Sequence, residues 1–258
     1  MRVPAHIVEE RRRQLRELVR RDGFIPVAEI CERFGVSIAT ARRDLAAIEN
    51  DGHITRTYGG ALADYNTSFA SIGERDRMAR SAKSIIAAAA ERKTPRDGTV
   101  YLDAGTTVLA LARLLAGRTS RQQLTVVTNS LAVATVLGGA PGITLHLIGG
   151  VFLHRQSVLF GEQSIEALRN WRFDAAFLGG QSLDATGIWN SHAEIVDLQR
   201  AVIEHSTTAF FCLDATKLGR STPHLVTRWP DAGMLVTDAT REQLRAQQVP
   251  LAQVVLAR

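Results

Sequence analysis

The chain has 258 residues, of which 45% are hydrophobic, and its formal net charge is +5. It is longer than one typical domain and apolar enough to form a sizeable core, so two globular domains are expected. The two cysteines, Cys31 and Cys212, belong to no C-x-x-C motif or Cys/His cluster, which excludes a disulfide framework and a zinc site. No apolar run approaches the roughly 18 residues of a membrane span, and the first residues form no apolar signal segment. We therefore expect a soluble cytoplasmic protein without a metal or cofactor.

Three short helical patterns occupy the first 50 residues. The first ends at Gly23, and the second begins after Pro26 and is broken by Gly35. The third fits between Ser37, a good N-cap, and Gly52, a good stop. Two helices joined by a tight glycine turn are typical of a helix-turn-helix motif.

The third helix has two different faces. Ala41, Leu45 and Ile48 form an apolar stripe, whereas Arg42 and Arg43 lie opposite it between alanines. Such a small cationic face can enter the major groove of DNA, although an ordinary solvated helix surface would look similar. Asp44 lies on the inner side of the arginines on the helical wheel. We expect it to orient a neighbouring basic side chain without touching DNA.

A β-prone segment closed by two glycines follows this helix, over residues 53–60, and has the size of a hairpin wing. Three helices and a wing make a winged helix-turn-helix, whose second motif helix reads the major groove. The excess of basic side chains lies within residues 1–120, which agrees with phosphate binding, although the surplus within residues 1–60 is small. The predicted DNA-binding residues are Ser37, Thr40, Arg42, Arg43 and Arg56.

The rest of the chain alternates between short apolar runs and helical patterns. Alternation of this kind predicts an α/β domain with a mostly parallel, Rossmann-like sheet. The predicted strands are 100–102, 125–127, 143–148, 175–178, 209–213, 234–236 and 254–256, and the helices between them are 108–115, 131–137, 163–169, 193–205 and 241–247. A helix is also expected from Glu74 through Ala90. We predict domains at 1–62 and 81–258, joined by a linker at 63–80.

Small and polar residues follow the predicted strands. Ligands of parallel α/β sheets bind beyond the carboxyl ends of the strands. Each of these segments alone is a routine turn, but four at one sheet edge predict a site for a small phosphorylated or polyhydroxylated ligand. Glu194 could equally favour the dipole of its helix, whereas Lys217, one of three lysines, could pair with a phosphate. The candidate residues are Asp103, Gly105, Thr106, Thr107, Thr128, Asn129, Gly149, Gly150, Glu194 and Lys217.

Two sets of motifs resemble one family. The run F-G-V-S-x-x-T-x-R-R-D-L-x-x-I-E-x-D-G, followed by R-T-Y-G-G-A, is similar to the N-terminal domain of the DeoR family of bacterial transcriptional regulators. The motifs L-D-A-G-T-T, T-N-S, G-G, D-A-A-F-L-G and D-A-T-K-L-G resemble its effector domain, so the resemblance covers nearly the whole chain. One departure is Ala41, where the family more often has Ile or Val. The resemblance implies an effector domain similar in fold to ribose-5-phosphate and glucosamine-6-phosphate isomerases.

The family resemblance also implies a function. Members usually sense phosphorylated intermediates of sugar or sugar-alcohol catabolism, and the candidate residues named above would line that site. The leading hypothesis is therefore a DNA-binding repressor of a carbohydrate operon, acting as a homodimer or homotetramer on operator DNA.

Two alternatives belong to other classes. A sugar-phosphate isomerase with an appended DNA-binding domain is disfavoured, because residues 179–184 read G-G-Q-S-L-D where isomerases have D-G-A-D-E. A nicotinamide-sensing regulator would need a G-x-G-x-x-G motif after a strand, which the sequence lacks.

Overall fold

The computed structural model describes residues 4–50, 54–56, 60–63, 69–118, 123–220, 222–229 and 231–258. The chain divides into two compact units, Met1–Ser71 and Ile72–Arg258. Among the described helices, none combines the length and apolar character that a membrane crossing requires.

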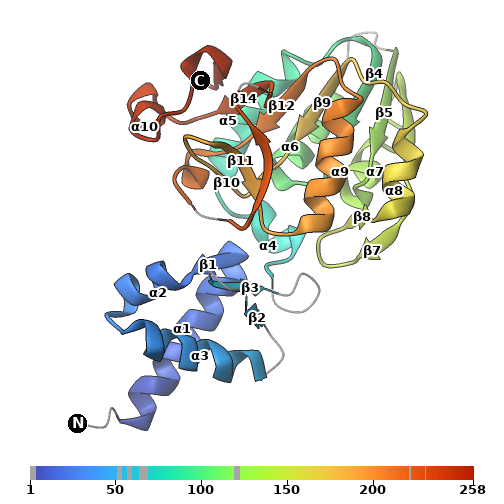
Figure 1. Ribbon diagram of the computed structural model, residues 1–258. Helices are drawn as coiled ribbons and strands as arrows, with labels where there is room; N and C mark the ends of the chain where they lie inside the picture. Colours follow the sequence, from blue (N-terminus) through green and yellow to red (C-terminus); the bar gives the residue numbers. More distant parts are fainter. Residues whose placement is uncertain are drawn as a thin grey trace. The chain divides into compact units, whose positions relative to one another are not determined.

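The described residues of the N-terminal unit form three helices and a small antiparallel sheet (Figure 1). The strand order is β1-β3-β2. Gly23, with φ of 80°, ends the first helix, and Gly35, with φ of 60°, ends the second in the left-handed region that favours glycine. The elements are α1 (Ala5–Asp22), β1 (Phe24–Pro26), α2 (Val27–Phe34), α3 (Ile38–Asn50), β2 (Ile54–Arg56) and β3 (Gly60–Ala63). The three predicted helices are confirmed, and β1 is an additional strand. Strands β2 and β3 lie where the wing was predicted, and residues 53 and 57–59 of that prediction lie outside the described residues.

The C-terminal unit is built on seven parallel strands in the order β15-β14-β12-β9-β4-β5-β6. These are the seven apolar runs that the sequence predicted as strands, so the predicted parallel α/β fold is confirmed. Their bounds are β4 (Asp97–Leu102), β5 (Gln123–Thr128), β6 (Ile143–Leu147), β9 (Ala175–Leu178), β12 (Ala209–Cys212), β14 (Met234–Thr237) and β15 (Val254–Leu256).

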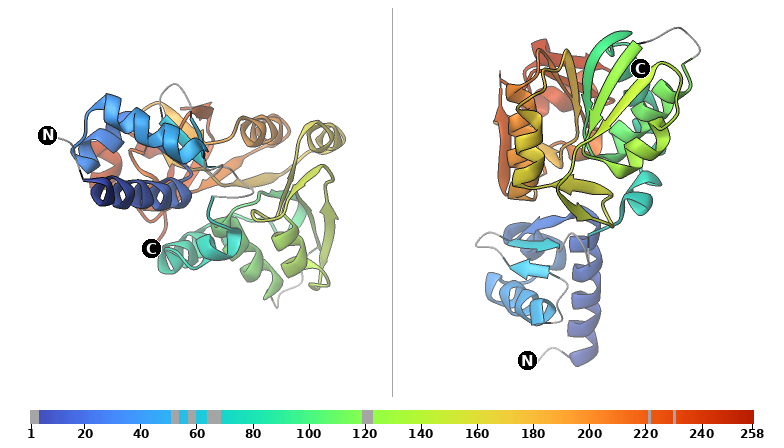
Figure 2. Two further views of the ribbon diagram at one scale, coloured as in Figure 1. Left: turned by 90° about the horizontal axis from the view of Figure 1, so that it is seen from below. Right: turned by 90° about the vertical axis from the view of Figure 1, so that its right-hand side faces the viewer.

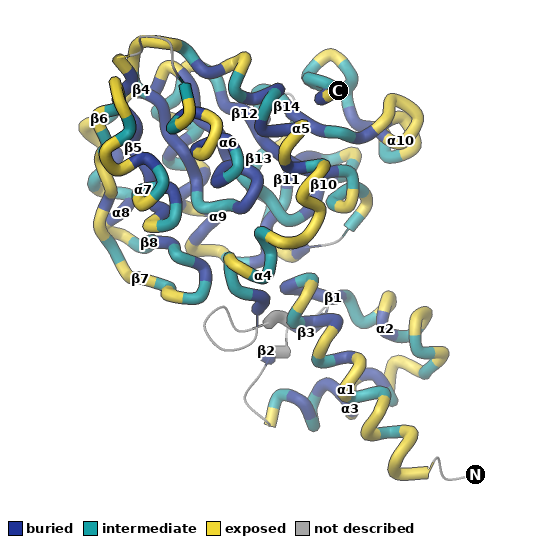
Figure 3. The backbone as a smooth tube through the Cα atoms, turned by 180° about the vertical axis from the view of Figure 1, so that it is seen from behind, coloured by how far each residue is buried: buried dark blue, intermediate teal, exposed yellow. Residues whose placement is uncertain are grey.

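Helices cover both faces of this sheet (Figure 2). Val100 and Leu102 pack into the cluster of α5, α6 and α7, whereas Tyr101 between them packs into the cluster of α8, α9 and α10. Strands β9 and β12 are therefore buried throughout, and β4 and β5 are buried in their carboxyl-terminal halves (Figure 3). The helices are α5 (Arg80–Glu91), α6 (Thr106–Ala116), α7 (Leu131–Leu137), α8 (Glu162–Leu168), α9 (Ala193–Glu204) and α10 (Arg241–Ala246).

Some elements differ from the prediction. The helix expected from Glu74 to Ala90 is broken into α4 (Ile72–Asp76) and α5, and Ala79 before α5 has φ of 48°. Helix α4 lies within the segment that was expected to be a linker. Small antiparallel pairings and short 3-10 helices were not predicted: β7 (Val151–Leu153), β8 (Val158–Phe160), β10 (Ser182–Leu183), β11 (Gly187–Asn190), β13 (His224–Arg228), η1 (Ala215–Lys217) and η2 (Leu251–Gln253).

The order of the strands defines one topological switch point. From β4 the chain proceeds to β5 and β6 on one side, and β9, β12, β14 and β15 follow on the other. Adjacent strand ends at such a point leave room where ligands bind in open α/β sheets. The carboxyl ends of β4 and β9, at Asp103 and Gly179, are therefore where a ligand site is expected.

Candidate DNA interface and effector site

The outer face of α3 is exposed and cationic. Arg42 and Arg43 are exposed, whereas Ala41 is completely buried against the core of the N-terminal unit. At the start of the helix, the Thr40 amide donates to Ser37 Oγ at 3.3 Å, and the two hydroxyl oxygens are 3.0 Å apart. Four of the five predicted DNA contacts therefore lie together at the start of α3.

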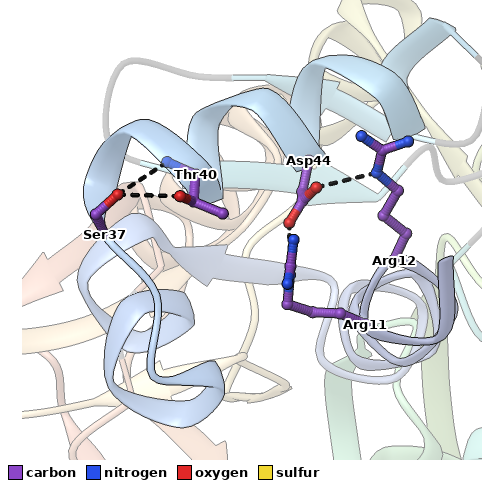
Figure 4. Close-up of polar contacts among 5 residues, drawn as sticks. All are labelled: Arg11, Arg12, Ser37, Thr40 and Asp44. Atoms are coloured by element: carbon purple, nitrogen blue, oxygen red, sulfur yellow. Dashed lines mark hydrogen bonds and ion pairs between the residues drawn. The ribbon is translucent and has the colours of Figure 1, made fainter. Parts of the chain in front are cut away.

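Asp44 ties α3 to α1 (Figure 4). It is only 2% exposed, and its two carboxylate oxygens accept hydrogen bonds from Arg11 Nε at 2.7 Å and Arg12 Nε at 3.0 Å. Both arginines bind Asp44 through Nε. Within the described part of the chain, their terminal amino groups have no hydrogen-bond partner. The expectation that Asp44 orients basic side chains agrees with this geometry. Its partners, however, lie more than 30 positions away on α1, where no sequence pattern indicated them.

The wing is described only in part. Arg56 ends β2, and its side chain lies outside what the structure describes. Its predicted contact with DNA therefore stays a prediction.

Asp103 is the most enclosed carboxylate at the switch point. It is 3% exposed, and its Oδ2 accepts hydrogen bonds from the Gly179 amide at 3.1 Å and from Gln199 Nε2 at 2.7 Å. Its Oδ1 accepts a hydrogen bond from the Ala104 amide at 2.8 Å. Burial raises the pKa of Asp103, while these donors and Asn129 act in the opposite direction. Residues after β4 and β9 and from α9 thus meet around one carboxylate that has no cationic partner among the described residues.

Gln199 contacts Asp103 directly, and Asn190 in turn contacts Gln199. Gln199 Nε2 also donates to the Gly179 carbonyl at 2.9 Å, and Gln199 Oε1 accepts from Asn190 Nδ2 at 3.1 Å. The sequence analysis missed both residues. Gln199 lies inside α9 and shares no sequence motif with Asp103, so only the fold shows that the two meet.

Thr128 and Asn129, at the end of β5, have different roles. The Thr128 hydroxyl donates to the Leu102 carbonyl at 2.6 Å and accepts from the Ser130 amide at 3.0 Å, so it shapes the strand end. Asn129 is fully buried and donates from Nδ2 to the Leu159 carbonyl at 3.2 Å. Its Oδ1 has no hydrogen-bond partner in the described residues, which leaves a buried acceptor for a ligand hydroxyl.

The predicted glycines and threonines are placed by backbone geometry. A Cβ on Gly105 would lie 3.9 Å from Gly179 Cα, so these two strand ends approach closely. Gly150 has φ of 142°, and a Cβ there would lie 2.2 Å from Ser164 Oγ. Gly149 accepts a 2.6 Å hydrogen bond from the same hydroxyl, so this glycine pair has a packing role. Thr106 and Thr107 are buried in the first turn of α6.

Glu194 and Lys217 lie on α9 and η1, outside the segments that follow β4, β5 and β9. Glu194 is exposed in the first turn of α9, and no described hydrogen bond joins it to the other candidate residues. Lys217 is half-buried in η1 directly after β12. Its neighbour Asp214 is buried and accepts a hydrogen bond from the Thr216 amide at 3.0 Å.

Lys83 is a further polar residue that the sequence analysis treated only as part of a helix. It is 6% exposed on α5, and Asp214 and Lys217 both influence its ionisation. The rarity of lysine in this arginine-rich chain was the only sequence signal that could have singled it out.

Asp184 is the acidic residue of the segment that replaces the isomerase motif. Its Oδ1 accepts hydrogen bonds from the Thr186 amide at 2.8 Å, the Gly187 amide at 3.2 Å and Trp189 Nε1 at 3.0 Å. The Oδ1 atom is thereby engaged by the turn between β10 and β11 and by Trp189 of β11. Among the described residues, no group of three or more His, Cys, Asp or Glu side chains could hold a metal ion.

Comparison with known proteins gives consistent results for both units. The DeoR-like helix-turn-helix domain model matches residues 11–67, and the DeoR C terminal sensor domain model matches residues 78–239. The transcriptional repressor AccR of Agrobacterium fabrum is 30% identical over 90% of this chain and 90% of its own length. The glycerol-3-phosphate regulon repressor of Escherichia coli K12 is 30% identical over 80% of this chain and 81% of its own length.

Solved structures are more distant. Ribose 5-phosphate isomerase A from Methanocaldococcus jannaschii superimposes with a TM-score of 0.40 at 15% identity, over 54% of each chain. A likeness of that size supports no statement about activity. The family models and the relatives together show that the chain belongs to the DeoR family, with a helix-turn-helix domain followed by a sensor domain.

Proposed function

We propose that this protein is a sequence-specific DNA-binding repressor of a carbohydrate or sugar-alcohol operon, controlled by a phosphorylated sugar that binds the C-terminal unit. The observation that carries the DNA-binding part is the exposed Arg42–Arg43 face of α3, opposite a buried apolar stripe and fixed to α1 through Asp44. The names of the relatives, which include the repressor of a glycerol-3-phosphate regulon, support the assignment to carbohydrate metabolism.

The DNA contacts divide into two kinds. Arg42 and Arg43 supply contacts to base edges or adjoining phosphates, because guanidinium groups bind guanine and phosphate in a bidentate manner. Ser37 and Thr40 contact phosphates or bases near the helix start, and Arg56 contacts the backbone or minor groove. A single winged helix offers a small interface, so a homodimer or homotetramer on repeated half-sites provides the affinity. Light scattering on the purified protein measures that state.

The effector site lies at the carboxyl edge of the sheet. Asp103 and Asn129 Oδ1, which has no partner among the described residues, accept hydrogen bonds from sugar hydroxyls. The first turn of α6 and Lys217 offer N–H groups and positive charge to a phosphate. The remaining candidates, Gly149, Gly150 and Glu194, shape the surrounding edge. A ligand that binds one arrangement of the protein better than another shifts the protein toward that arrangement. The resulting change in DNA affinity is limited by the difference between the ligand's affinities for the two arrangements.

Isomerase activity is the competing function. Proton transfer between neighbouring sugar carbons needs a carboxylate within reach of the substrate as general base. Asp184, in the segment that replaces the isomerase motif, is engaged by three donors of its own turn. This geometry favours ligand sensing without turnover, and an isomerase assay on pentose and hexose phosphates checks it.

Fluorescence anisotropy at fixed salt tests the proposal. Labelled DNA from upstream of the protein's own gene is titrated with and without a panel of phosphorylated sugars, because salt strongly alters phosphate contacts. Specific binding that one sugar phosphate weakens is the expected result. The Arg43→Ala variant should lose about 1–3 kcal/mol of binding free energy if Arg43 reads a base. Absence of specific binding under every ligand would contradict the proposal.

Lysine variants separate the two sites. Lys217→Ala should abolish the effector response while DNA affinity stays unchanged, because Lys217 lies in the sensor unit. Lys93→Ala is the matched control, since Lys93 is exposed near the end of α5. A full effector response in Lys217→Ala would remove this lysine from the site.

A further inference from the structure

Two arginines of α1 end beside α3. Arg11 and Arg12 each donate through Nε to Asp44, at 2.7 and 3.0 Å, and within the described part of the chain neither contacts another carboxylate. Nε is one donor of the guanidinium fork, and the terminal amino groups carry the others. Because two guanidinium charges face one carboxylate, the cluster keeps a net positive charge and donors that no described residue uses.

Core packing does not account for the position of this part of α1. The buried residues of the helix are Leu15, Leu18 and Val19, which all belong to its second half, whereas residues 5–14 are exposed or partly exposed. Within the cluster, the side chain of Asp44 is only 3% exposed, but that of Arg12 is 28% exposed. The carboxylate is therefore enclosed, while the arginine that binds it stays open to a partner from solution.

The cluster lies on the flank of α3, whereas Arg42 and Arg43 lie on its outer face. Thr40 and Asp44 are about one helical turn apart, so they share one side of α3. Figure 4 shows the guanidinium groups from α1 on this same side. A helix is about 10–12 Å across and the major groove is about 12 Å wide. The flanks of a helix in the groove therefore meet phosphates, while its outer face meets the bases.

We infer that Arg12, assisted by Arg11, binds a backbone phosphate of the operator through its terminal amino groups while its Nε stays on Asp44. The inference rests on the proposed function, because it takes the N-terminal unit to bind DNA through α3. Guanidinium groups bind phosphates in a bidentate manner. Asp44 holds both side chains in place before DNA binds, so they lose less conformational freedom in the complex. Asp44 is thus a positioning residue that fixes α3 and orients the arginines beside it.

A phosphate contact has a characteristic effect on affinity. It carries no base information, so it strengthens binding to the operator and to unrelated DNA alike. It also makes binding more sensitive to salt, by a slope of about 0.9 in the logarithmic plot for each phosphate neutralised. These two properties distinguish a phosphate contact from a contact to a base edge.

Fluorescence anisotropy over a series of salt concentrations tests this contact on the full-length protein. The probes are the labelled upstream duplex and an unrelated duplex of equal length. We expect Arg12→Met to weaken binding to both duplexes about tenfold and to reduce the salt slope by about one. Arg12→Lys, which keeps the charge, should keep the slope. Circular dichroism checks that each variant is folded.

Arg13→Met is the matched control. Arg13 follows Arg12 on the same helix and is 60% exposed, but its guanidinium already donates to Glu10 at 2.9 and 2.7 Å. Its salt slope should therefore equal that of the wild type. An unchanged slope in Arg12→Met would overturn the inference. An equal loss of slope in Arg13→Met would also overturn it, because the effect would then come from diffuse charge.

Uncharged phosphate analogues locate the contact. Among single methylphosphonate substitutions along the upstream duplex, one should weaken binding of the wild type and have no further effect on Arg12→Met. A purely structural role of Arg12 would make the effects of the variant and of the substitution additive at every position. Additivity throughout would overturn the inference.

The proposed function and the role of Arg12 fail differently. If the wild type binds the upstream and the unrelated duplex equally tightly, the repressor proposal fails, and the salt slopes still decide the role of Arg12. If the wild type prefers the upstream duplex and Arg12→Met keeps both affinity and slope, only the role of Arg12 fails. If the wild type binds neither duplex, both fail.

Discussion

The two units each bury one carboxylate at the centre of a candidate site, and the partners of these carboxylates differ. Asp44 in the N-terminal unit is 2% exposed and contacts two guanidinium groups. Asp103 in the C-terminal unit is 3% exposed and accepts hydrogen bonds only from neutral amides of the described residues. Two arginines neutralise the first carboxylate, whereas the second has no cationic partner among the residues that the structure describes.

This difference separates a positioning role from a binding role. A carboxylate paired with two arginines fixes the elements that carry them, and removing it leaves unpaired charges. Burial raises the pKa of a carboxylate that has no cationic partner. The oxygens of such a carboxylate can still accept hydrogen bonds from a ligand.

The largest effect is expected from Asp44→Asn. Loss of the charge leaves Arg11 and Arg12 without their common partner, so the N-terminal unit should lose about 2–4 kcal/mol of unfolding free energy. Denaturant unfolding followed by circular dichroism measures this loss. Tryptophan fluorescence serves as the internal control, because Trp171, Trp189 and Trp229 all lie in the C-terminal unit. An unchanged transition would show that the ion pairs do not hold α3 to α1.

A pH-dependent effect is expected from Asp103→Asn. Since burial raises the pKa of Asp103 in the folded state, its folded form holds the proton more tightly than its unfolded form. Its contribution to stability is therefore greatest below the unfolded pKa and declines as pH rises through the folded pKa. The wild type should lose stability relative to Asp103→Asn as pH rises from the ordinary pKa of an aspartate toward the raised folded pKa, which tryptophan-monitored unfolding measures. A difference that is constant with pH would contradict the raised pKa.

A smaller effect is expected from Arg12→Met. Asp44 keeps Arg11 at 2.7 Å, so the variant should lose about 0.5–1.5 kcal/mol, which is less than Asp44→Asn. The same circular dichroism transition provides the measurement. A loss as large as that of Asp44→Asn would mean that Arg12 alone carries the contact.

The smallest effect is expected from Glu10→Gln. A hydrogen bond from Arg13 lowers the pKa of Glu10 to about 2, yet the two side chains are 51% and 60% exposed. Solvent screens such exposed pairs. The unfolding midpoint of Glu10→Gln at pH 7 should therefore stay within experimental error of the wild-type value. A clear decrease would show that an exposed carboxylate of this protein contributes to stability as a buried one does.

The sequence predicted the architecture because local patterns determine it. The seven predicted apolar runs form the seven strands of the parallel sheet. Gly23 and Gly35 end α1 and α2 as expected. The short strand β1 includes Pro26 and was missed, since proline is unusual inside strands. Ala79, with its positive φ, precedes α5 where a continuous helix was expected. No turn residue had signalled that break.

The candidate sites were predictable only in part. Motif residues such as Arg42, Arg43 and Asp103 stood out because they follow a cap or a strand. Their partners did not, because Arg11 is 33 positions from Asp44 and Gln199 is 96 positions from Asp103. Such pairs depend on tertiary packing, which local periodicity does not encode.

The most direct test of this account compares Asp103→Asn with Asp44→Asn in the anisotropy assay at fixed salt. The account predicts that Asp103→Asn binds operator DNA as tightly as the wild type but no longer responds to the sugar phosphate. It also predicts that Asp44→Asn binds DNA more weakly, because α3 is less well positioned, and that its residual binding still responds. A normal effector response in Asp103→Asn would contradict the placement of the effector site at the carboxyl edge of the sheet.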